Sequence, residues 1–197
     1  MTSESLKDLQ KHLQSLPTIG EKSAGRLALF LLSQPKDKTL GLARSIVNAL
    51  EKCKPCSSCF VLSDYDPCVI CSSIDREQDK LCIVESSRDV FLIENTREYH
   101  GKYFVLGNLL SPIDGIGPKE LRIPELIGLV EKGEFTEVIL AIPPSTEGET
   151  TMHYLSESLS HKVSNITRLS TGIPYGSDME YTATATIVNA MRRRYVV

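Results

Sequence analysis

The chain has 197 residues, of which 41% are hydrophobic, and a formal net charge of −3. This length suits one domain or two small ones with a real core. The absence of tryptophan and the 6% aromatic content argue against a base-stacking sheet as the main binding surface. The longest apolar stretches fall far short of the roughly 20 residues of a membrane helix. Because the N-terminus also lacks the apolar core of a signal peptide, we expect a cytoplasmic protein.

The charge is unevenly distributed along the chain. Residues 1–55 carry nine Lys and Arg against five Asp and Glu, a balance of +4, whereas residues 56–197 have a balance of −7. Affinity for phosphate is therefore predicted in the N-terminal part of the chain.

The first 33 residues predict a helical hairpin. Apolar spacing indicates helices over residues 4–14 and 22–33, with Pro17 ending the first and Gly20 permitting a tight turn. Such a turn presents backbone N–H groups at a helix N-terminus, where a DNA phosphate can bind. Lys22 and Arg26 share one helix face and are the candidate DNA-binding residues. The alternative is an ordinary hairpin used for packing or dimerisation.

Two Cys-x-x-Cys pairs follow a third predicted helix near residues 38–52. Cys56 and Cys59 are separated by eight residues from Cys68 and Cys71. This spacing predicts that four thiolates surround one structural zinc ion, with no ligand position left open for catalysis.

The sequence supports other interpretations of the cysteines less well. The four cysteines could instead form disulfides or remain free thiols, but disulfides belong to an oxidising compartment. Cys53 offers a second register with Cys56 that leaves Cys59 without a partner, so we interpret Cys53 as a spare. Cys82 lies in an apolar run and is predicted to be buried in the core.

The second half of the chain alternates short apolar runs with helical segments. This pattern predicts an α/β fold with a mostly parallel sheet covered on both faces. The predicted strands are Leu81–Val84, Tyr103–Leu106, Glu137–Ile142 and Ile166–Ser170; the predicted helices lie near Arg88–Thr96, Pro124–Lys132 and Glu149–Leu159.

Acidic residues follow two of these strands. Glu85 comes directly after the first, and Glu147 and Glu149 open the helix after the third. Carboxylates at neighbouring strand ends can hold Mg²⁺ for phosphoryl chemistry. The alternative is that Glu147 and Glu149 simply favour the positive end of their helix.

This arrangement resembles the Toprim domain of topoisomerases and bacterial primases. There, an Asp-x-Asp pair normally precedes a turn like Glu147-Gly-Glu149. Pro143 and Ser145 stand at the places of those aspartates. Because neither supplies a carboxylate, the sequence argues against a catalytic Mg²⁺ ion.

The order of the parts resembles the RecR family of bacterial recombination proteins from end to end. The segments that carry the resemblance are Leu16-Pro-x-Ile-Gly20-x-Lys22-Ser-Ala24, the two Cys-x-x-Cys pairs, Cys82-Ile-Val-Glu85, Tyr103-Phe-Val-Leu-Gly107, Leu110-Ser-Pro-Ile-Asp114-Gly-Ile-Gly-Pro118, Glu137-Val-Ile-Leu-Ala141, Glu147-Gly-Glu149 and Gly172-Ile-Pro-Tyr-Gly176. The chain departs from the family at Thr18, which replaces the first glycine of the hairpin. Ser177 and Ala183 are departures in a Walker-B-like stretch, where they weaken any inference of ATP binding.

The resemblance implies four parts. These are a helix-hairpin-helix module over residues 1–52, a four-cysteine zinc finger over 53–72, a Toprim domain over 79–175, and a C-terminal helix or tail over 176–197 that makes oligomer contacts.

The resemblance also implies a function. Members of the family are non-catalytic mediators of DNA repair that act with RecO and RecF at gaps and help to load RecA. They form tetrameric rings that encircle DNA without reading its sequence. Lys22 and Arg26 would then face the DNA. Glu85, Asp114, Glu147 and Glu149 would line the Toprim surface and contact a partner, first of all RecO. The rival interpretations are a Mg²⁺-dependent Toprim enzyme that acts on phosphodiesters, and a zinc-stabilised interaction module without a DNA role.

Overall fold

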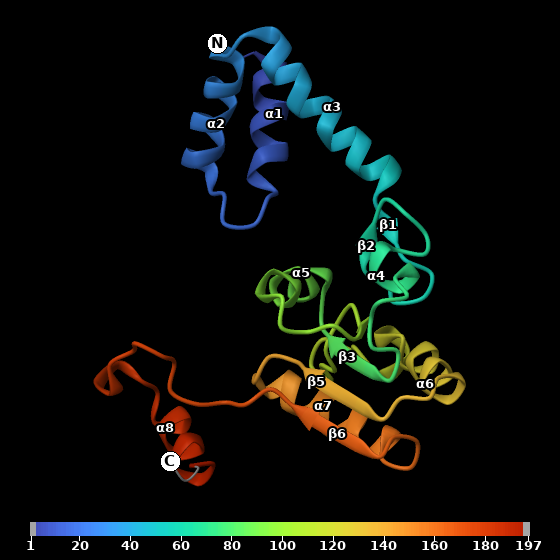
Figure 1. Ribbon diagram of the computed structural model, residues 1–197. Coiled ribbons are helices and arrows are strands. Elements are labelled where there is room, and N and C mark those ends of the chain that lie inside the picture. The colour runs from blue at the N-terminus through green and yellow to red at the C-terminus, as the bar shows by residue number, and fades with distance from the viewer. Residues whose placement is uncertain (1–2, 195–197) are drawn as a thin grey trace. The chain divides into compact units, whose positions relative to one another are not determined.

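The computed structural model describes residues 3–194 and divides the chain into two units, Met1–Cys53 and Lys54–Val197 (Figure 1). We call the first the helical unit and the second the α/β unit. No helix among the described residues is both long and apolar enough to cross a membrane.

The helical unit consists of α1 (Glu4–Gln14), α2 (Glu21–Ser33) and α3 (Lys36–Lys52), as predicted to within two residues at each end. Helices α1 and α2 pack side by side, and Ala24 and Ala28 are buried between them. These two alanines are one helical turn apart, and their small side chains permit a close approach of the two helices. The hydroxyl of Thr39 in α3 donates to the carbonyl of Leu31 in α2 at 2.8 Å.

The hairpin turn is tight. The Ile19 N–H donates to the Leu16 carbonyl at 3.2 Å, and Gly20 in extended conformation precedes α2. Thr18 has a φ of 68°, the left-handed region that glycine enters at little cost. The turn therefore keeps a conformation suited to glycine, although a β-branched residue occupies the position.

The α/β unit contains a sheet of four parallel strands in the order β4-β3-β5-β6. The strands are β3 (Lys80–Val84), β4 (Lys102–Val105), β5 (Glu137–Ala141) and β6 (Asn165–Arg168). The expectation of a mostly parallel sheet is confirmed, and each predicted strand is present with both ends within two residues of the prediction. Continuous apolar runs form these strands because a parallel sheet is buried on both faces.

Alternate side chains of the strands enter two cores. On one face, residues such as Ile83 and Phe104 pack with the helices α6 (Ile123–Lys132) and α7 (Thr146–Leu159). On the other face, residues such as Cys82 and Val84 pack with α5 (Ser87–Thr96) and with the cysteine-containing module. A 3₁₀ helix, η1 (Pro118–Leu121), leads into α6.

Helix α7 begins three residues before its predicted start. The Ser145 hydroxyl accepts from the Gly148 N–H at 3.0 Å and so caps the helix. After β6, the chain forms a 3₁₀ helix, η2 (Met179–Tyr181), and an α-helix, α8 (Thr184–Arg192).

The cysteine-containing module is small and is joined closely to the sheet. It consists of the antiparallel pair β1 (Lys54–Pro55) and β2 (Leu62–Ser63) and the short helix α4 (Val69–Ser72). The Val105 N–H donates to the Cys59 carbonyl at 2.9 Å. The ring of Phe60 meets Phe104 edge-on with 5.4 Å between centroids. The module therefore shares a core with the sheet and is not an independent finger.

Candidate functional site

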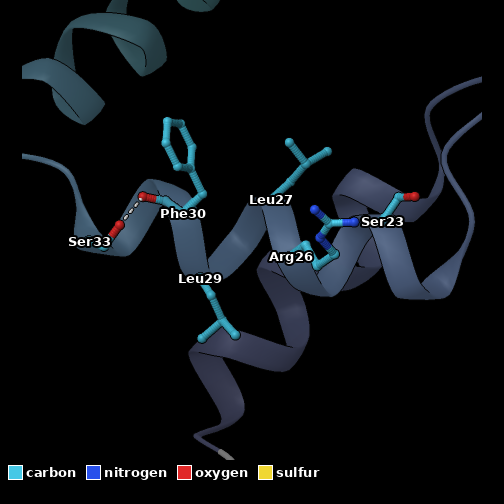
Figure 2. A pocket seen from close by; sticks show the side chains of 6 residues that line it. All are labelled: Ser23, Arg26, Leu27, Leu29, Phe30 and Ser33. Carbon is cyan, nitrogen blue, oxygen red and sulfur yellow. Dashed lines mark hydrogen bonds between the residues drawn. The ribbon is translucent and has the colours of Figure 1, made fainter.

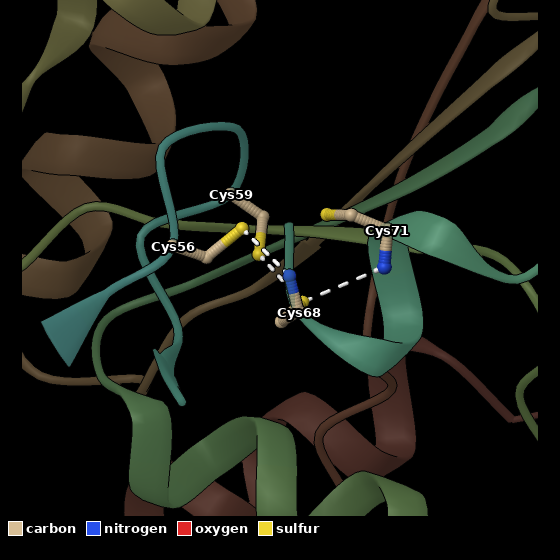
Figure 3. A group of neighbouring side chains, drawn as sticks. All are labelled: Cys56, Cys59, Cys68 and Cys71. Atoms are coloured by element: carbon tan, nitrogen blue, oxygen red, sulfur yellow. Dashed lines mark hydrogen bonds between the residues drawn. The ribbon is translucent and has the colours of Figure 1, made fainter. Parts of the chain in front are cut away.

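The four cysteines of the two Cys-x-x-Cys pairs come together in one group (Figure 3). Their sulfur atoms all lie within 4.8 Å of one another, and among the described residues they are the only group of three or more side chains placed to hold one metal ion. Cys56, Cys59 and Cys68 are buried, whereas Cys71 is partly exposed. Four sulfurs bonded to one zinc ion at about 2.3 Å are separated by roughly 3.8 Å, so this group fits one ion.

Local structure turns the sulfurs inward. Cys56 follows β1, and the chain reverses through Phe60, which has a φ of 63°. Cys68 is the residue before α4, and the backbone N–H of Cys71 donates to its sulfur at 3.5 Å. The Cys68 N–H donates to the sulfur of Cys56 at 3.3 Å. These N–H groups stabilise negative charge on sulfur, as a metal-bound thiolate requires.

Three thiols of the cluster have pKa values that are shifted by burial and by one another. Hydrogen bonding from the Cys71 thiol lowers the pKa of Cys59 to about 6. Burial raises the pKa of Cys68 to about 11, and the hydrogen bond to Cys59 raises the pKa of Cys71. The negative charge of Cys59 and burial both oppose ionisation of Cys68 and Cys71. A bound dication removes that opposition, and four soft sulfur ligands suit zinc.

The two other cysteines lie outside the cluster, as predicted. Cys53 follows the last residue of α3 and does not belong to the group. Cys82 lies in β3, only 2% exposed, and burial raises its pKa to about 12.

The acidic residues of the Toprim resemblance follow three of the parallel strands in the chain. Glu85 follows β3, and the pKa of its carboxyl is raised by burial and by the nearby charge of Asp89. Asp114 accepts from the Ser111 hydroxyl at 2.6 Å in the loop after β4. Glu147 lies in the first turn of α7, where a carboxylate favours the positive helix end.

Glu149 is held by an arginine that the sequence did not single out. The guanidinium of Arg168, the last residue of β6, donates to both Glu149 carboxylate oxygens at 2.7 and 3.0 Å. The pKa of Glu149 is lowered mainly by this contact. No group of three acidic residues within ligand distance was found in the described part of the chain. Glu149 is therefore an ion-pair partner of Arg168.

The neighbouring residues also have structural roles. The Ser145 hydroxyl is engaged in capping α7. A Cβ atom on Gly148 would lie 1.8 Å from the Pro143 carbonyl oxygen, so only glycine fits between the two glutamates.

Lys22 and Arg26 are exposed on α2, away from the buried Ala24 and Ala28. Neither forms an ion pair with a described residue. The residue before α2 is Gly20, which has no side chain to bond the amides of the first helical turn. Arg26 lies on the same helix as the apolar Leu27 and Phe30, which project from one side of α2 (Figure 2).

Comparison with known proteins gives consistent matches along the chain. Residues 6–50 match the helix-hairpin-helix domain of RecR, and residues 79–170 match the Toprim domain. Recombination protein RecR of Gloeobacter violaceus is 46% identical over 194 residues, which cover 98% of each chain. Recombination protein RecR of Heliobacterium modesticaldum is 43% identical, and the match covers 98% of this chain and 96% of the relative. Recombination protein RecR of Acinetobacter baylyi is 42% identical, and the match covers 98% of each chain.

Proposed function

The chain belongs to the RecR family of recombination proteins, and we propose that it is a non-enzymatic, DNA-binding mediator of recombinational repair. In this proposal it works in the cytoplasm with RecO and RecF at DNA gaps and helps to load RecA. The observation that carries the proposal is the similarity to proteins named recombination protein RecR, at 42–46% identity over 92–98% of this chain.

The DNA contact is proposed at the start of α2. Lys22 and Arg26 supply two exposed positive charges one helical turn apart, and the uncapped first turn supplies backbone N–H groups for a phosphate. All of these groups recognise the sugar-phosphate backbone and none reads a base. Binding is therefore expected to be independent of sequence and to fall steeply with salt.

The test compares two double variants in binding to a labelled oligonucleotide across a salt series. Lys22→Ala with Arg26→Ala should reduce the slope of log affinity against log salt by about 2, because each lost phosphate contact removes about 0.9 from the slope on duplex DNA. Lys7→Ala with Lys11→Ala is the matched control, since these lysines are also exposed and four apart, on α1. The control should bind as the wild type does.

Equal binding by the wild type and the Lys22/Arg26 variant at low salt would contradict the DNA contact. It would favour the alternative in which the chain is a zinc-stabilised interaction module with no DNA role. Strong preference for one duplex sequence at constant salt would contradict recognition through phosphates.

The metal is proposed to be one structural Zn²⁺ ion per chain, held by Cys56, Cys59, Cys68 and Cys71. Four sulfur ligands leave no open position, so the ion supplies folding energy and no chemistry. Zinc quantification on the purified protein tests this directly, and one equivalent per chain is expected.

The oligomer is proposed to be a tetrameric ring that encircles DNA. Support comes from large apolar side chains of the helical unit that are exposed in a single chain: Leu16, Leu27, Leu29, Phe30, Leu32, Leu40, Leu42, Ile46, Val47 and Leu50. Apolar surface of this extent is characteristic of protein interfaces. The segment 176–197 is proposed to make further contacts between subunits. Light scattering with and without DNA should give a tetramer, and a monomer indifferent to DNA would contradict the ring.

The acidic end of the sheet is proposed as a protein-binding surface. The residues proposed for this surface are Glu85, Asp114, Glu147 and Glu149, and RecO is the first candidate partner. Pro143 and Ser145 supply no carboxylate, and Glu149 is paired with Arg168. These features support a role in binding over phosphodiester chemistry. Metal-dependent nuclease or DNA-relaxing activity of the pure protein, abolished by Glu85→Ala, would establish the rival enzyme function.

A further inference from the structure

The first residue of β4, Lys102, reaches across to the end of the cysteine-containing module. Its ammonium nitrogen lies 3.0 Å from the carbonyl oxygen of Ile70, 3.1 Å from that of Cys71, and 3.1 Å from that of Ser73. A lysine ammonium has three N–H donors and no acceptor. All three donors are therefore used, and all three acceptors belong to the segment that carries the fourth cysteine.

These three carbonyls need an external partner. Helix α4 has only four residues, and the chain leaves it at Ser73 in an extended conformation. The last carbonyls of a helix have no partner within the helix, and a cation at that end is favourable because the carbonyl oxygens are partly negative. Lys102 satisfies the end of α4 and thereby determines where Cys71 lies.

The position of Lys102 is itself firmly defined. Its strand pairs with β3, with Lys102 opposite Leu81, and its carbonyl accepts from the Tyr99 hydroxyl at 2.9 Å. The preceding residue is buried Gly101, where a Cβ atom would lie 2.8 Å from the Lys80 carbonyl oxygen. The ammonium is therefore presented by a rigid strand and not by a mobile loop.

The charge of Lys102 also suits the metal centre. Four thiolates around one dication carry a net charge of −2. Lys102 lines the same cavity as Cys59 and Cys71, and it is partly buried, where screening by water is weaker than at the surface. A positive charge at this place stabilises the anionic cluster in addition to orienting one of its ligands.

From these contacts we propose that Lys102 is a positioning residue of the metal centre, which holds Cys71 in its ligating orientation and neutralises part of the cluster's charge. This inference rests on the proposed metal site. It makes the beginning of β4 part of the centre, so that the sheet and the metal hold the module jointly. Outer partners of metal ligands typically contribute 10- to 100-fold to metal affinity.

The experiment measures the rate at which zinc leaves the full-length protein in excess chelator at 25 °C. Lys102→Met removes the ammonium but keeps an unbranched side chain, and should release zinc about 10- to 100-fold faster than the wild type. The matched control is Lys80→Met. Lys80 is the first residue of the neighbouring strand and pairs with Glu77 at 3.1 Å. The control should release zinc within about twofold of the wild-type rate if the proposed outer-partner effect is specific to Lys102.

A second variant covers the case in which Lys102→Met does not fold. Lys102→Arg keeps the charge, but its planar donors cannot converge on three carbonyls as an ammonium does. The rate of zinc release from Lys102→Arg should lie between those of the wild type and Lys102→Met. Cobalt-substituted protein gives an independent readout, because the sulfur-to-cobalt absorption bands should shift in both Lys102 variants and not in Lys80→Met.

The outcomes separate this inference from the metal site on which it rests. Wild-type protein without bound zinc would overturn both. Wild-type protein with one zinc per chain, together with wild-type release rates and cobalt spectra in Lys102→Met and Lys102→Arg, would overturn the role of Lys102 alone. A lower melting temperature with unchanged zinc release would likewise reduce Lys102 to a packing role.

Discussion

The helical unit and the α/β unit differ in how they bury apolar surface. In the helical unit the buried residues among those described are only Ala24 and Ala28, whereas the α/β unit has two continuous cores around its sheet. The helical unit nevertheless contains many large apolar side chains, and most of them are exposed. The difference shows that the sheet of the α/β unit is covered within one chain, while the helical unit leaves most of its large apolar side chains uncovered.

The sequence of α2 explains this difference. Its apolar residues, among them Leu27, Leu29 and Phe30, lie on more than one side of the helix, and only the alanine side is covered by α1. A helix that is apolar on several sides is normally surrounded by protein. The comparison between the units can therefore be tested by substituting a cysteine or a core residue in the α/β unit and an exposed apolar residue in the helical unit.

The largest effect is expected in the α/β unit on loss of the proposed metal. Cys59→Ala should abolish zinc binding, because the binding energy of a structural metal is folding energy. We expect a loss of more than about 3 kcal/mol and a fall in Tm of roughly 10 °C. Calorimetry with zinc quantification measures both. Cys53→Ala is the control and should keep its zinc; full zinc content and an unchanged Tm in Cys59→Ala would contradict the ligand assignment.

A pair of Phe→Ala changes compares the two units directly. Phe104 is 0% exposed in the sheet, and its truncation should destabilise the α/β unit by about 3–5 kcal/mol in urea unfolding. Phe30 is 55% exposed on α2, and its truncation should change the unfolding free energy of a single chain by less than about 0.5 kcal/mol.

The effect of Phe30→Ala should appear instead in self-association, measured by sedimentation over a range of concentrations. Loss of a central apolar side chain weakens an interface by more than about 1 kcal/mol where the residue is buried by the partner. An unchanged association constant would show that this side of α2 is not the interface.

The hairpin turn offers a smaller change within the helical unit. A left-handed conformation costs a non-glycine residue roughly 1–2 kcal/mol, and glycine loses about 0.5–1 kcal/mol in chain entropy on folding. Thr18→Gly should therefore stabilise the helical unit by up to about 1 kcal/mol, as followed by circular dichroism on heating. Thr18→Ala retains a Cβ atom and is the matched control. Destabilisation by glycine would contradict the positive φ at this turn.

The smallest effect is expected for the ion pair of Glu149 and Arg168. Glu149 is about half exposed, so solvent screening limits the contribution of the pair to less than about 1 kcal/mol. Because the pKa of Glu149 is lowered in the folded state, its contribution is present above the ordinary glutamate pKa and is lost as the pH falls through the lowered value. Glu149→Gln should lack this pH dependence in urea unfolding. An identical pH profile for the two proteins would show that the pair contributes nothing.

Much of the fold could be predicted because its signals are local. Apolar runs of four to six residues predicted all four strands, since a parallel sheet covered on both faces requires them. The ends of helices were less predictable where a polar side chain caps the helix, as Ser145 caps α7. The contact of Glu149 was not predictable from its neighbours in the sequence, because its partner Arg168 comes from a separate strand.

The sequence by itself determined which four cysteines come together in one group, because a Cys-x-x-Cys turn brings two sulfurs together within four residues. It also determined membership of the RecR family and the positive charge of the helical unit, which are properties of residue identity and order. Only the tertiary structure decided that Lys102 caps the segment of Cys71 some 30 residues away, and that Phe104 packs on Phe60. Contacts of this kind depend on how the strands are ordered in the sheet, and no local pattern in the chain encodes that order.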